Sequence, residues 1–539
     1  STTHIKTKSY GGTLKMTKQT DTVNVSGNYE TYAYYANSSY LNSGTLNIYG
    51  DFSHIGESFT PGDDLKINFL KDGVTNVSFA NTGSNFNSNT HFNSGKIQIN
   101  SPFYGWKLAD NLNVCGSFPS FKGTLDLNGH TLTVNGDLKQ SDSSGYMYIN
   151  GGTLNVKGNY LLYNETTDST THIKTKSYGG TLNMTKQTDT VNVDGNYETY
   201  ANYGSSSYLN NGTLNIHGNF SHLGDIFTPG DNLEINFLKD GITEVSFANT
   251  SAHFNSNTHF KSGKLKLSGK PSGWTLHQDL TFSDTLPAFS GTFDLNGYTM
   301  NISDDLNQPS GTIKVNGGTL NISGNYNLYG TKTNEVSDLE EYVSGGTLVT
   351  SKAADVVNIG KDFVAYGDES SSSLQYGTIN INGDLTHLGY NFAPSNNVTL
   401  NFKKVGTTTL NFASTAGHLN TNSHFSSGNV MILGKPMGWT LNEDITIYGD
   451  MPAFTGTFDL NGHGLTFEKS LTQPTGSIKV NCGTLHMKGD YNLHSTKIDD
   501  VTDEKTLASG GSFLMQNVKD KVTIDGNFTV YSSNGSDYL

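Results

Sequence analysis

The chain repeats itself over long distances, and this constrains its fold more than any other feature. Residues 1–14 and 169–182 carry the same letters, STTHIKTKSYGGTL. A glycine pair marks one position of each long repeat, and its copies are Gly11-Gly12, Gly179-Gly180, Gly345-Gly346 and Gly510-Gly511. The period is about 166 residues, and a nearly fixed period of this kind is typical of stacked repeat architectures.

The long period divides the chain into three repeats and the beginning of a fourth. Their boundaries are 1–168, 169–334, 335–499 and 500–539. Solenoid arrays normally carry polar capping units at their ends. The repeat pattern runs to both ends of this sequence without such a unit. We therefore expect one continuous solenoid without caps, cut from a longer array.

A shorter period lies inside the long one. GTLNIYGDF at 44–52 returns in related form at 152–160, 212–220, 318–326 and 483–491. The spacing of these anchors predicts units of about 28 residues, about six in each long repeat and about 19 in all. At the usual strand spacing, such a stack is on the order of 90 Å long.

Each unit has the pattern of a short strand followed by a tight turn. Thr-Leu-Asn-Ile alternates apolar and polar residues, and a Gly-Asn or Gly-Asp turn comes next. One such unit cannot bury its own apolar face, but stacked copies can share a core. We therefore predict an all-β fold, a parallel β-helix. Representative inward residues are Leu46, Ile48, Leu154, Val156, Leu214, Ile216, Leu320 and Ile322.

Equivalent asparagines, expected at the corners, suit ladders of side-chain amides between identical stacked strands. They are Asn47, Asn155, Asn215 and Asn321. The one segment with a helical pattern, EVSDLEEYV at 335–343, is expected to be an excursion on the surface. Leucine-rich repeats and immunoglobulin-like arrays fit less well, because the first need a Leu-x-x-Leu-x-Leu line and the second about 100 residues per domain.

Composition narrows the choice of partners. The formal net charge is −15, and all 33 basic residues are lysines without clusters. This acidic charge balance argues against nucleic acid as a binding partner. No run of 18 apolar residues occurs, so no membrane span is expected. The expected partners are further copies of the same array, end to end or side by side, and polysaccharide.

Two cysteines, Cys115 and Cys482, occupy non-equivalent positions about 13 turns apart. A disulfide between them is excluded, because bridged Cα atoms lie within about 7 Å. The small number of cysteines is consistent with a secreted protein that is stabilised by a long β-ladder and not by disulfides. We expect an extracellular or cell-surface location.

Parallel β-helices include pectin-cleaving enzymes, so catalysis is an alternative. Carboxylate pairs for glycoside hydrolysis occur at Asp63-Asp64 and Asp304-Asp305, but at turn positions where Asp and Asn interchange between repeats. Lyases of this fold use an arginine base, and the sequence contains no arginine. We expect no enzyme and no cofactor, while isolated calcium ions and a polysaccharide-active enzyme stay open alternatives.

Histidines recur at fixed places and form the pattern His-x5-His at His253 with His259 and at His418 with His424. Imidazoles suit zinc, copper or nickel, so these four are the metal-ligand candidates. The first repeat has Asn85 where His253 stands, and no cysteine or fixed carboxylate completes a ligand set. Hydrogen bonding to the next turn is the alternative role.

Each long repeat carries one tryptophan after a proline-containing turn, at Trp106, Trp274 and Trp439. Tryptophan gives a large contact area, so a row of these rings is a candidate interaction face for polysaccharide or a neighbouring copy. The alternative is that each ring closes the side of the core.

Segments such as GTLNVKGNY and GTLDLNGHTLTVNGDL resemble the large repetitive β-solenoid proteins of bacterial surfaces, including filamentous-haemagglutinin-type adhesins. The resemblance covers the whole chain but is one of style, and the units here are longer than the coils of that family. It implies an exported fibre, stalk or adhesin and assigns no functional residue. The leading expectation is a structural, non-catalytic segment of an extracellular bacterial filament, and the alternative is an adhesin that binds polysaccharide or a host surface through Trp and Tyr faces.

Overall fold

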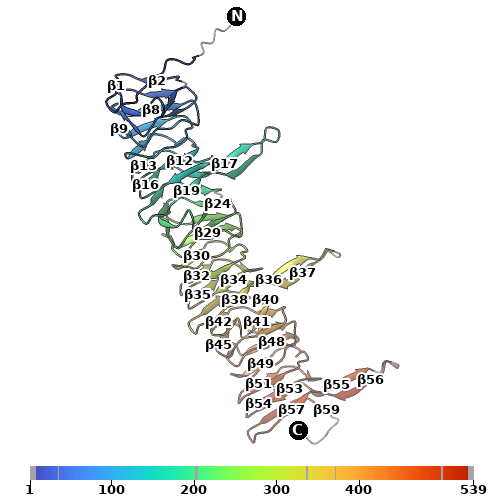
Figure 1. Ribbon diagram of the computed structural model, residues 1–539. Coiled ribbons are helices and arrows are strands. Elements are labelled where there is room, and N and C mark those ends of the chain that lie inside the picture. Colours follow the sequence, from blue (N-terminus) through green and yellow to red (C-terminus); the bar gives the residue numbers. More distant parts are fainter. Residues whose placement is uncertain are drawn as a thin grey trace. The chain divides into compact units, whose positions relative to one another are not determined.

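The chain folds as a parallel β-helix of about 21 turns, which confirms the predicted fold class (Figure 1). The computed structural model describes residues 8–33, 35–200, 204–335, 338–370, 372–498, 500 and 502–531. Within these ranges every regular element is a β-strand. The ends of the repeat pattern, residues 1–7 and 532–539, lie outside them, so the expectation of an uncapped array stays a prediction.

The chain forms two compact units, residues 1–272 and 273–539. In the first unit, parallel strands build three faces. The first face holds β1 (Thr22–Val25), β4 (Ser43–Ile48), β7 (Asp64–Phe69) and β9 (Thr90–Phe92), then a sheet of β12 (Gly123–Asp126), β15 (Gly145–Tyr148) and β19 (Thr181–Asn183), and the pair β22 (Gly204–Ser205) and β25 (Phe227–Thr228). The second face holds β2 (Tyr29–Thr31), β5 (Phe52–His54), β8 (Thr75–Phe79), β10 (Lys96–Ile99), β11 (Leu112–Val114), β13 (Thr131–Val134), β16 (Thr153–Val156), β20 (Thr190–Val193), β23 (Asn211–Ile216), β26 (Asn232–Phe237) and β28 (Thr258–Phe260). The third face holds the pair β3 (Ala36–Asn37) and β6 (Phe59–Thr60), then β14 (Leu138–Lys139), β17 (Tyr160–Thr167), β21 (Tyr197–Thr199), β24 (Phe220–His222), β27 (Thr243–Phe247) and β29 (Lys264–Gly269).

The second unit repeats this plan. One series is β30 (Leu280–Phe282), β32 (Thr299–Ile302), β35 (Thr319–Ile322), β39 (Val356–Ile359), β42 (Gly377–Ile381), β45 (Val398–Phe402) and β47 (Ser423–Phe425). Another is β33 (Leu306–Asn307), β36 (Tyr326–Thr333), β40 (Phe363–Ala365), β43 (Leu385–His387), β46 (Thr408–Phe412), β48 (Asn429–Gly434), β49 (Ile445–Ile447), β51 (Gly464–Phe467), β54 (Thr484–Met487) and β58 (Lys521–Ile524). The remaining sheets are β31 (Thr292–Asp294), β34 (Thr312–Lys314) and β38 (Thr347–Val349); β41 (Asp368–Ser370) and β44 (Asn391–Ala393); β50 (Thr457–Asp459), β53 (Ser477–Lys479) and β57 (Ser512–Leu514); and β52 (Leu471–Thr472), β55 (Tyr491–Ile498) and β59 (Phe528–Val530).

Most turns are shorter than the sequence pattern predicted. Neighbouring strands pair Asn24 with Asn47 and Asn47 with Asn68, which are steps of 23 and 21 residues. From Asn155 to Asn192 the step is 37 residues, because a hairpin is inserted in that turn. Seven pairing steps lead from β2 to β20, so a long repeat contains about seven turns rather than six. The predicted unit of about 28 residues was wrong because its anchors lie on different faces, since Gly123 begins β12 on the first face and Thr153 begins β16 on the second.

The inserted hairpins are antiparallel ribbons that project from the solenoid wall (Figure 1). They pair β17 with β18 (Lys174–Tyr178), β36 with β37 (Glu340–Ser344), and β55 with β56 (Lys505–Ser509). Among the described residues, the three tips contain His172, Asp338 and Asp503, each with positive φ. The helical pattern at 335–343 therefore belongs to a hairpin, in which Val336 and Ser337 lie outside the described residues.

The sequence pattern moves to another face of the solenoid in the course of a long repeat. In the first unit, β10 and β11 are neighbours on the second face. Lys96 pairs with Asn113, so the turn that joins these strands is unusually short. The Thr-Leu-Asn-Val strand β16 therefore continues the second face, whereas its counterpart β4 lies on the first. A shortened turn of the same kind joins β48 and β49 in the second unit, where Asn429 pairs with Thr446. Each shortened turn moves the pattern forward by one face.

All eight inward residues proposed from the sequence are buried, at 3% exposure or less. Aromatic rings fill the core between them. Phe69 and Phe92 stack 4.6 Å apart, and Phe86 meets Phe69 edge-on at 5.4 Å. Burial of such rings supplies the main driving force for a chain with so few apolar residues.

Amide ladders run along the outer surface of the Thr-Leu-Asn-Ile strands. Asn192 donates to Asn155 at 2.8 Å, and Asn215 donates to Asn192 at 2.8 Å. In the second unit Asn358 donates to Asn321 at 2.7 Å. The predicted ladders are present, although these asparagines lie within strands and not at corners.

Candidate functional site

The candidate site is built from the strands that follow the Gly-Asn or Gly-Asp corner. β21 and β24 have three residues each, with the outer two side chains of each strand directed inward and only the middle one outward. Four stacked strands therefore present one row of outward side chains, and the residues at the corners add a parallel row. The result is a shallow groove that crosses β21, β24, β27 and β29.

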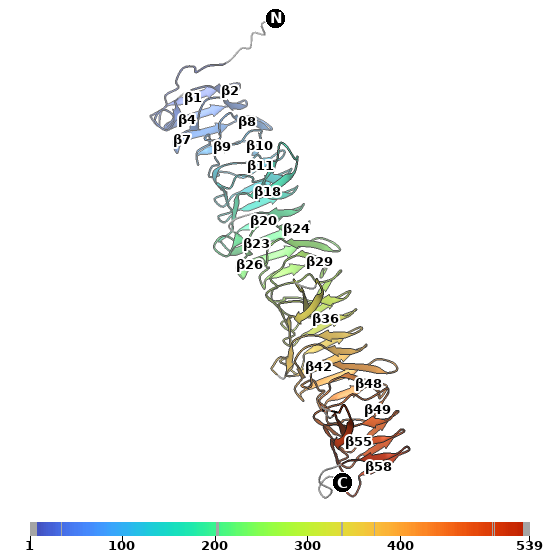
Figure 2. The same ribbon diagram turned by 90° about the vertical axis from the view of Figure 1, so that its right-hand side faces the viewer.

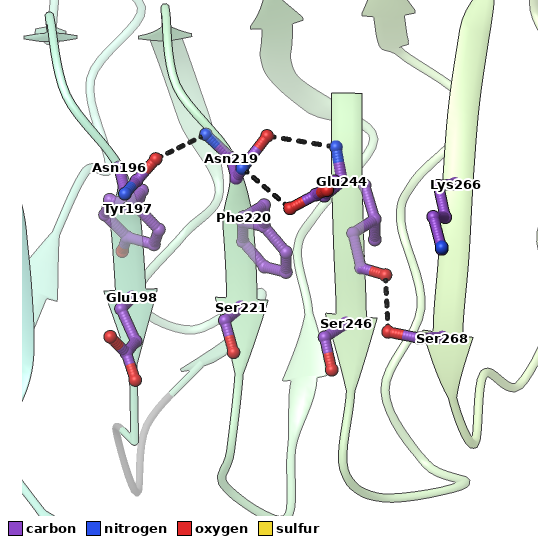
Figure 3. A pocket seen from close by; sticks show the side chains of 11 residues that line it. Asn196, Tyr197, Glu198, Asn219, Phe220, Ser221, Glu244, Ser246, Lys266 and Ser268 are labelled. Carbon is purple, nitrogen blue, oxygen red and sulfur yellow. Dashed lines mark hydrogen bonds between the residues drawn. The ribbon is translucent and has the colours of Figure 1, made fainter. Parts of the chain in front are cut away.

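This groove, which we name groove B, holds about 340 Å³ of space (Figure 3). Its corner row consists of Asn196, Asn219, Glu244 and Lys266. Its middle row consists of Glu198, Ser221, Ser246 and Ser268. Because neighbouring strands are about 4.8 Å apart, each row offers a polar group at that interval.

Hydrogen bonds between successive turns hold the corner row in place. The backbone N–H of Asn219 donates to the side-chain oxygen of Asn196 at 2.8 Å. In the next turn the backbone N–H of Glu244 donates to the side-chain oxygen of Asn219 at 3.0 Å. The Asn219 side-chain amide also donates to the Glu244 carboxylate at 3.0 Å. This is why the corner favours Asn or Asp, since their short side chains reach the backbone of the following turn.

The floor of groove B consists of buried, stacked aromatic rings. Tyr197 and Phe220 stack 5.9 Å apart beneath it, and both are at most 2% exposed. Burial raises the pKa of Tyr197 well above its usual range, so this phenol stays neutral. A groove with such a floor is organised before any ligand arrives, which reduces the entropy lost on binding.

The hairpin of β17 and β18 borders groove B. Lys176 of β18 forms an ion pair with Glu198. Partial burial lowers the pKa of Lys176, but the bond with the Glu198 carboxylate outweighs it and the net shift is upward. Glu198 is therefore positioned as an acceptor at one end of the middle row.

An equivalent groove, groove A, crosses β2, β5, β8 and β10 in the same unit and holds about 200 Å³. It is lined by Asn28, Glu30, Asp51, Ser53, Asn76, Ser78 and Asn100, together with the inward residues Tyr29, Phe52 and Val77.

The carboxylates of groove A have lysine partners. Lys8 forms an ion pair with Glu30, as Lys176 does with Glu198 in groove B. Lys71 donates to Asp51 at 2.6 Å, and the Asn76 N–H donates to it at 2.8 Å. Burial opposes ionisation of Asp51, but these bonds outweigh it and lower its pKa.

Strand pairing shows which residues of the two grooves correspond. Glu30 pairs with Ser53 as Glu198 pairs with Ser221, and Ser53 pairs with Ser78 as Ser221 pairs with Ser246. At the positions of Asp51 and Asn76 in groove A, groove B has Asn219 and Glu244, so a carboxylate and an amide exchange places. Each groove thus keeps two carboxylates.

The third long repeat has different side chains at these positions. Pairing places Val364 where Glu198 stands, since Val364 pairs with Thr386 as Glu198 pairs with Ser221. Met431 and Leu433 of β48 replace Lys266 and Ser268 of β29. Leu433 is 41% exposed, so this row has apolar side chains at both ends, while Thr386 and Asn411 between them stay polar.

The three tryptophans lie in the core and not on an exposed face. Trp106, Trp274 and Trp439 are 4%, 5% and 6% exposed. The Trp106 ring meets Phe86 edge-on at 5.5 Å and lies 5.5 Å from Phe103. The structure therefore corrects the proposed interaction face, because rings buried in a shortened turn fill its interior.

The four histidines proposed as metal ligands contact neighbouring groups. His259 and His424 each contact an asparagine of the same turn at 3.2 Å, Asn257 and Asn422. His418 contacts the Ala416 carbonyl oxygen at 3.3 Å, and burial lowers the pKa of His253. In the described part of the chain, no group of three or more His, Cys, Asp and Glu side chains could hold a metal ion. Cys115 and Cys482 are free and exposed.

The grooves were not predicted from the sequence. The signal was present, because Asn-Tyr-Glu-Thr at 28–31 and at 196–199 precedes Phe-Ser-His at 52–54 and at 220–222. Each of these strands puts one polar residue between two inward ones. Comparing the outward residues across consecutive turns, rather than along the chain, would have produced both rows.

Comparison with known protein families matches residues 40–219. This segment is similar to a carbohydrate-binding domain-containing protein. The match spans about a third of the chain and includes β5, β8 and β10 of groove A and β21 of groove B. No curated protein and no solved structure matches the chain.

At a coarse level, a repetitive β-solenoid with such a segment fits the expected kind of surface protein. The likeness to haemagglutinin-type adhesins and the association with further copies of the array stay predictions. No helix in the described ranges has the length and apolar character needed to cross a membrane.

Proposed function

We propose that the protein binds carbohydrate through grooves A and B and does not cleave it. The observation that carries this proposal is the pair of polar rows that recurs at equivalent positions in two long repeats. Amides, carboxylates and hydroxyls at intervals of about 4.8 Å suit the repeated hydroxyl groups of a linear sugar chain. The similarity of residues 40–219 to a carbohydrate-binding domain-containing protein supports the same class of ligand.

The charge of the grooves favours a neutral polysaccharide. Three of their four carboxylates are paired with lysines, Glu30 with Lys8, Asp51 with Lys71 and Glu198 with Lys176. These three lysines are engaged by groove carboxylates, and Lys266 is the one lysine among the described residues that line groove B, so a polyanion would meet no cluster of cations. The proposal also assigns the protein to the cell exterior, where such polymers occur, with the solenoid as the support that holds the grooves.

The test is binding of purified protein to immobilised neutral glucans, mannans and galactans, with polygalacturonate as the anionic comparison. The test variant replaces groove residues with those of the third repeat, E30V and N100L in groove A and E198V and S268L in groove B. The control is E234V, an exposed glutamate to valine exchange on β26 outside the grooves. We expect loss of neutral glycan binding in the four-fold variant and none in the control.

Two outcomes would contradict the proposal. One is that the wild-type protein binds none of the neutral polymers. The other is that the four-fold variant, with an unchanged β-sheet circular dichroism spectrum, still binds as the wild type does. Release of reducing sugars from a bound polymer would contradict the non-catalytic assignment alone.

A further inference from the structure

Grooves A and B lie on the same side of the first unit. Groove A begins at β2 and groove B at β21. Seven pairing steps lead from β2 to β20, and β21 is the next strand along the chain after β20, just as β2 is the next after β1. In Figure 2, β2, β8 and β10 lie on the right-hand side of the unit, as do β24 and β29. The grooves nevertheless belong to different sheets, since groove A crosses the second face and groove B the third.

The change of face explains this alignment. Stacked strands twist by about 10–35° per step, so an accumulated rotation of one third of a full rotation over about seven turns lies within the usual range. One face of a three-sided coil is also about one third of a rotation. The shortened turn between β10 and β11 moves the groove pattern by one face, which is a rotation of the size needed to offset such a twist.

The middle row of groove B extends towards groove A. This row runs across the strands, along the stacking direction. Lys139 and Leu161 occupy the same row position in the two turns before Glu198, because Lys139 pairs with Leu161 and Leu161 pairs with Glu198. Phe118 bridges to Leu138, which sets Pro119 beside Lys139 in the turn that follows groove A. The row thus reaches back to the shortened turn, where the row of groove A ends at Asn100.

The hairpin of β17 and β18 flanks this route. Its antiparallel pairing begins at Tyr163, just beyond Leu161 in the same strand. Lys139 lies over the Tyr163 ring, with 5.6 Å between its Nζ and the ring centroid. A chain that leaves groove A along the row would therefore be guided by this hairpin into groove B.

We propose that one extended, neutral polysaccharide chain occupies both grooves at once. This inference rests on the proposed function. Equivalent points of the grooves are about seven turns apart, or about 34 Å at strand spacing. A chain long enough to span that distance binds the second groove intramolecularly, so its affinity rises by about 10²–10⁴ above that of a short chain.

The experiment is isothermal titration of the full chain with size-graded oligosaccharides of the neutral polymer that binds best in the screen above. Short oligosaccharides are expected to bind weakly at two sites per protein. Oligosaccharides that span about 34 Å are expected to bind at one site per protein, with affinity increased by about 10²–10⁴.

Single-groove variants separate this inference from the proposed function. E30V and E198V each adopt a residue that the third repeat has at the same position, and N100L and S268L serve if the first pair alters folding. Each is expected to retain one site for short oligosaccharides and to lose the dependence on length. Two sites without any dependence on length would overturn the shared chain and leave the proposed function intact. Absence of all binding would overturn both.

Discussion

Corner residues with positive φ show how strictly the turn selects its amino acids. Asn150-Gly151 and Asn316-Gly317 both adopt left-handed conformations at one corner, and Asn481-Cys482 does so in the third repeat. A side chain with a Cβ is strained in that region, whereas glycine is not. Cys482, with φ of 67°, is therefore held in a strained conformation by its neighbours.

Replacing Cys482 with glycine should stabilise the protein by about 1 kcal/mol, because the left-handed conformation then carries no Cβ penalty. The measurement is the urea midpoint, with hydrogen exchange to locate the effect in the last turns. The control is C115S, at an exposed cysteine outside the positive-φ positions, which should change nothing. A lower midpoint for C482G would show that the thiol makes a stabilising contact.

Buried histidines make the first unit sensitive to acid. His54 and His222 are fully buried, and desolvation is the main cause that lowers the pKa of each to about 4. In the unfolded chain the pKa of histidine is about 6.5. Between these values the unfolded state binds protons that the folded state does not, so this contribution to stability is complete above about pH 6.5 and is lost towards pH 4.

The expected slope is about 1.4 kcal/mol per pH unit for each histidine in that window. Urea titrations at a series of pH values measure it. H54F/H222F should flatten the curve, whereas H217Q, at an exposed histidine, should not. An unchanged slope in the double variant would mean that other groups dominate acid unfolding.

At the scale of elements, the shortened turn depends on its tryptophan. Gly105 precedes Trp106 with φ of 101°, and a Cβ there would lie 2.5 Å from the Thr124 carbonyl oxygen. The close approach of backbone to backbone explains the Gly-Trp pair. The ring then fills the interior that the missing residues leave.

W106A should therefore cost about 3–5 kcal/mol through the cavity it creates. Urea denaturation measures the loss, with Y104A, at a residue that is 51% exposed, as the control. Loss of carbohydrate binding by W106A at an unchanged urea midpoint would instead support the aromatic binding face inferred from the sequence.

The turn that bears each hairpin contains a buried polar network. The Tyr160 hydroxyl donates to the Gln140 side-chain oxygen at 3.0 Å, and the Gln140 amide donates to the Gly145 carbonyl oxygen at 2.7 Å. Tyrosine and glutamine repeat the first bond at 2.6 Å in the later repeats, as Tyr326 with Gln308 and Tyr491 with Gln473. These bonds satisfy polar groups in the core where the hairpin departs.

Y160F should destabilise this turn by about 1–3 kcal/mol, because the Gln140 oxygen loses its donor in a buried place. Hydrogen exchange of the amides in β16, β17 and β20 reports the local effect. Y148F, at a half-buried outward tyrosine, is the control. Equal protection in both variants would show that water replaces the lost donor.

At the scale of the whole molecule, the sequence predicted the architecture but not the number of residues per turn. Alternation in Thr-Leu-Asn-Ile identifies the strand and its inward face, so buried residues such as Leu46 and Ile216 followed directly. The turn length did not, because Gly-Thr-Leu recurs only in some turns and inserted hairpins lengthen others. Pairing such as Lys96 with Asn113 depends on the stack and not on local sequence.

The grooves were missed for a related reason. Glu198, Ser221 and Ser246 are far apart in the sequence, and only the strand register brings them into one row. A polar residue in the middle of a short strand looks like an ordinary exposed position. Its role depends on its neighbours on adjacent turns.

The change of face has a consequence for how such a chain can evolve. Grooves A and B belong to successive long repeats and lie on the same side of the first unit, so a duplicated long repeat with its shortened turn would carry its groove in the same direction. A duplicated single turn would not, and it would rotate every groove and hairpin beyond it. Recombination between near-identical copies, such as 1–14 and 169–182, can therefore change the number of repeats freely. If selection keeps the grooves facing one way, the segment that is duplicated or lost is the long repeat and not the single turn.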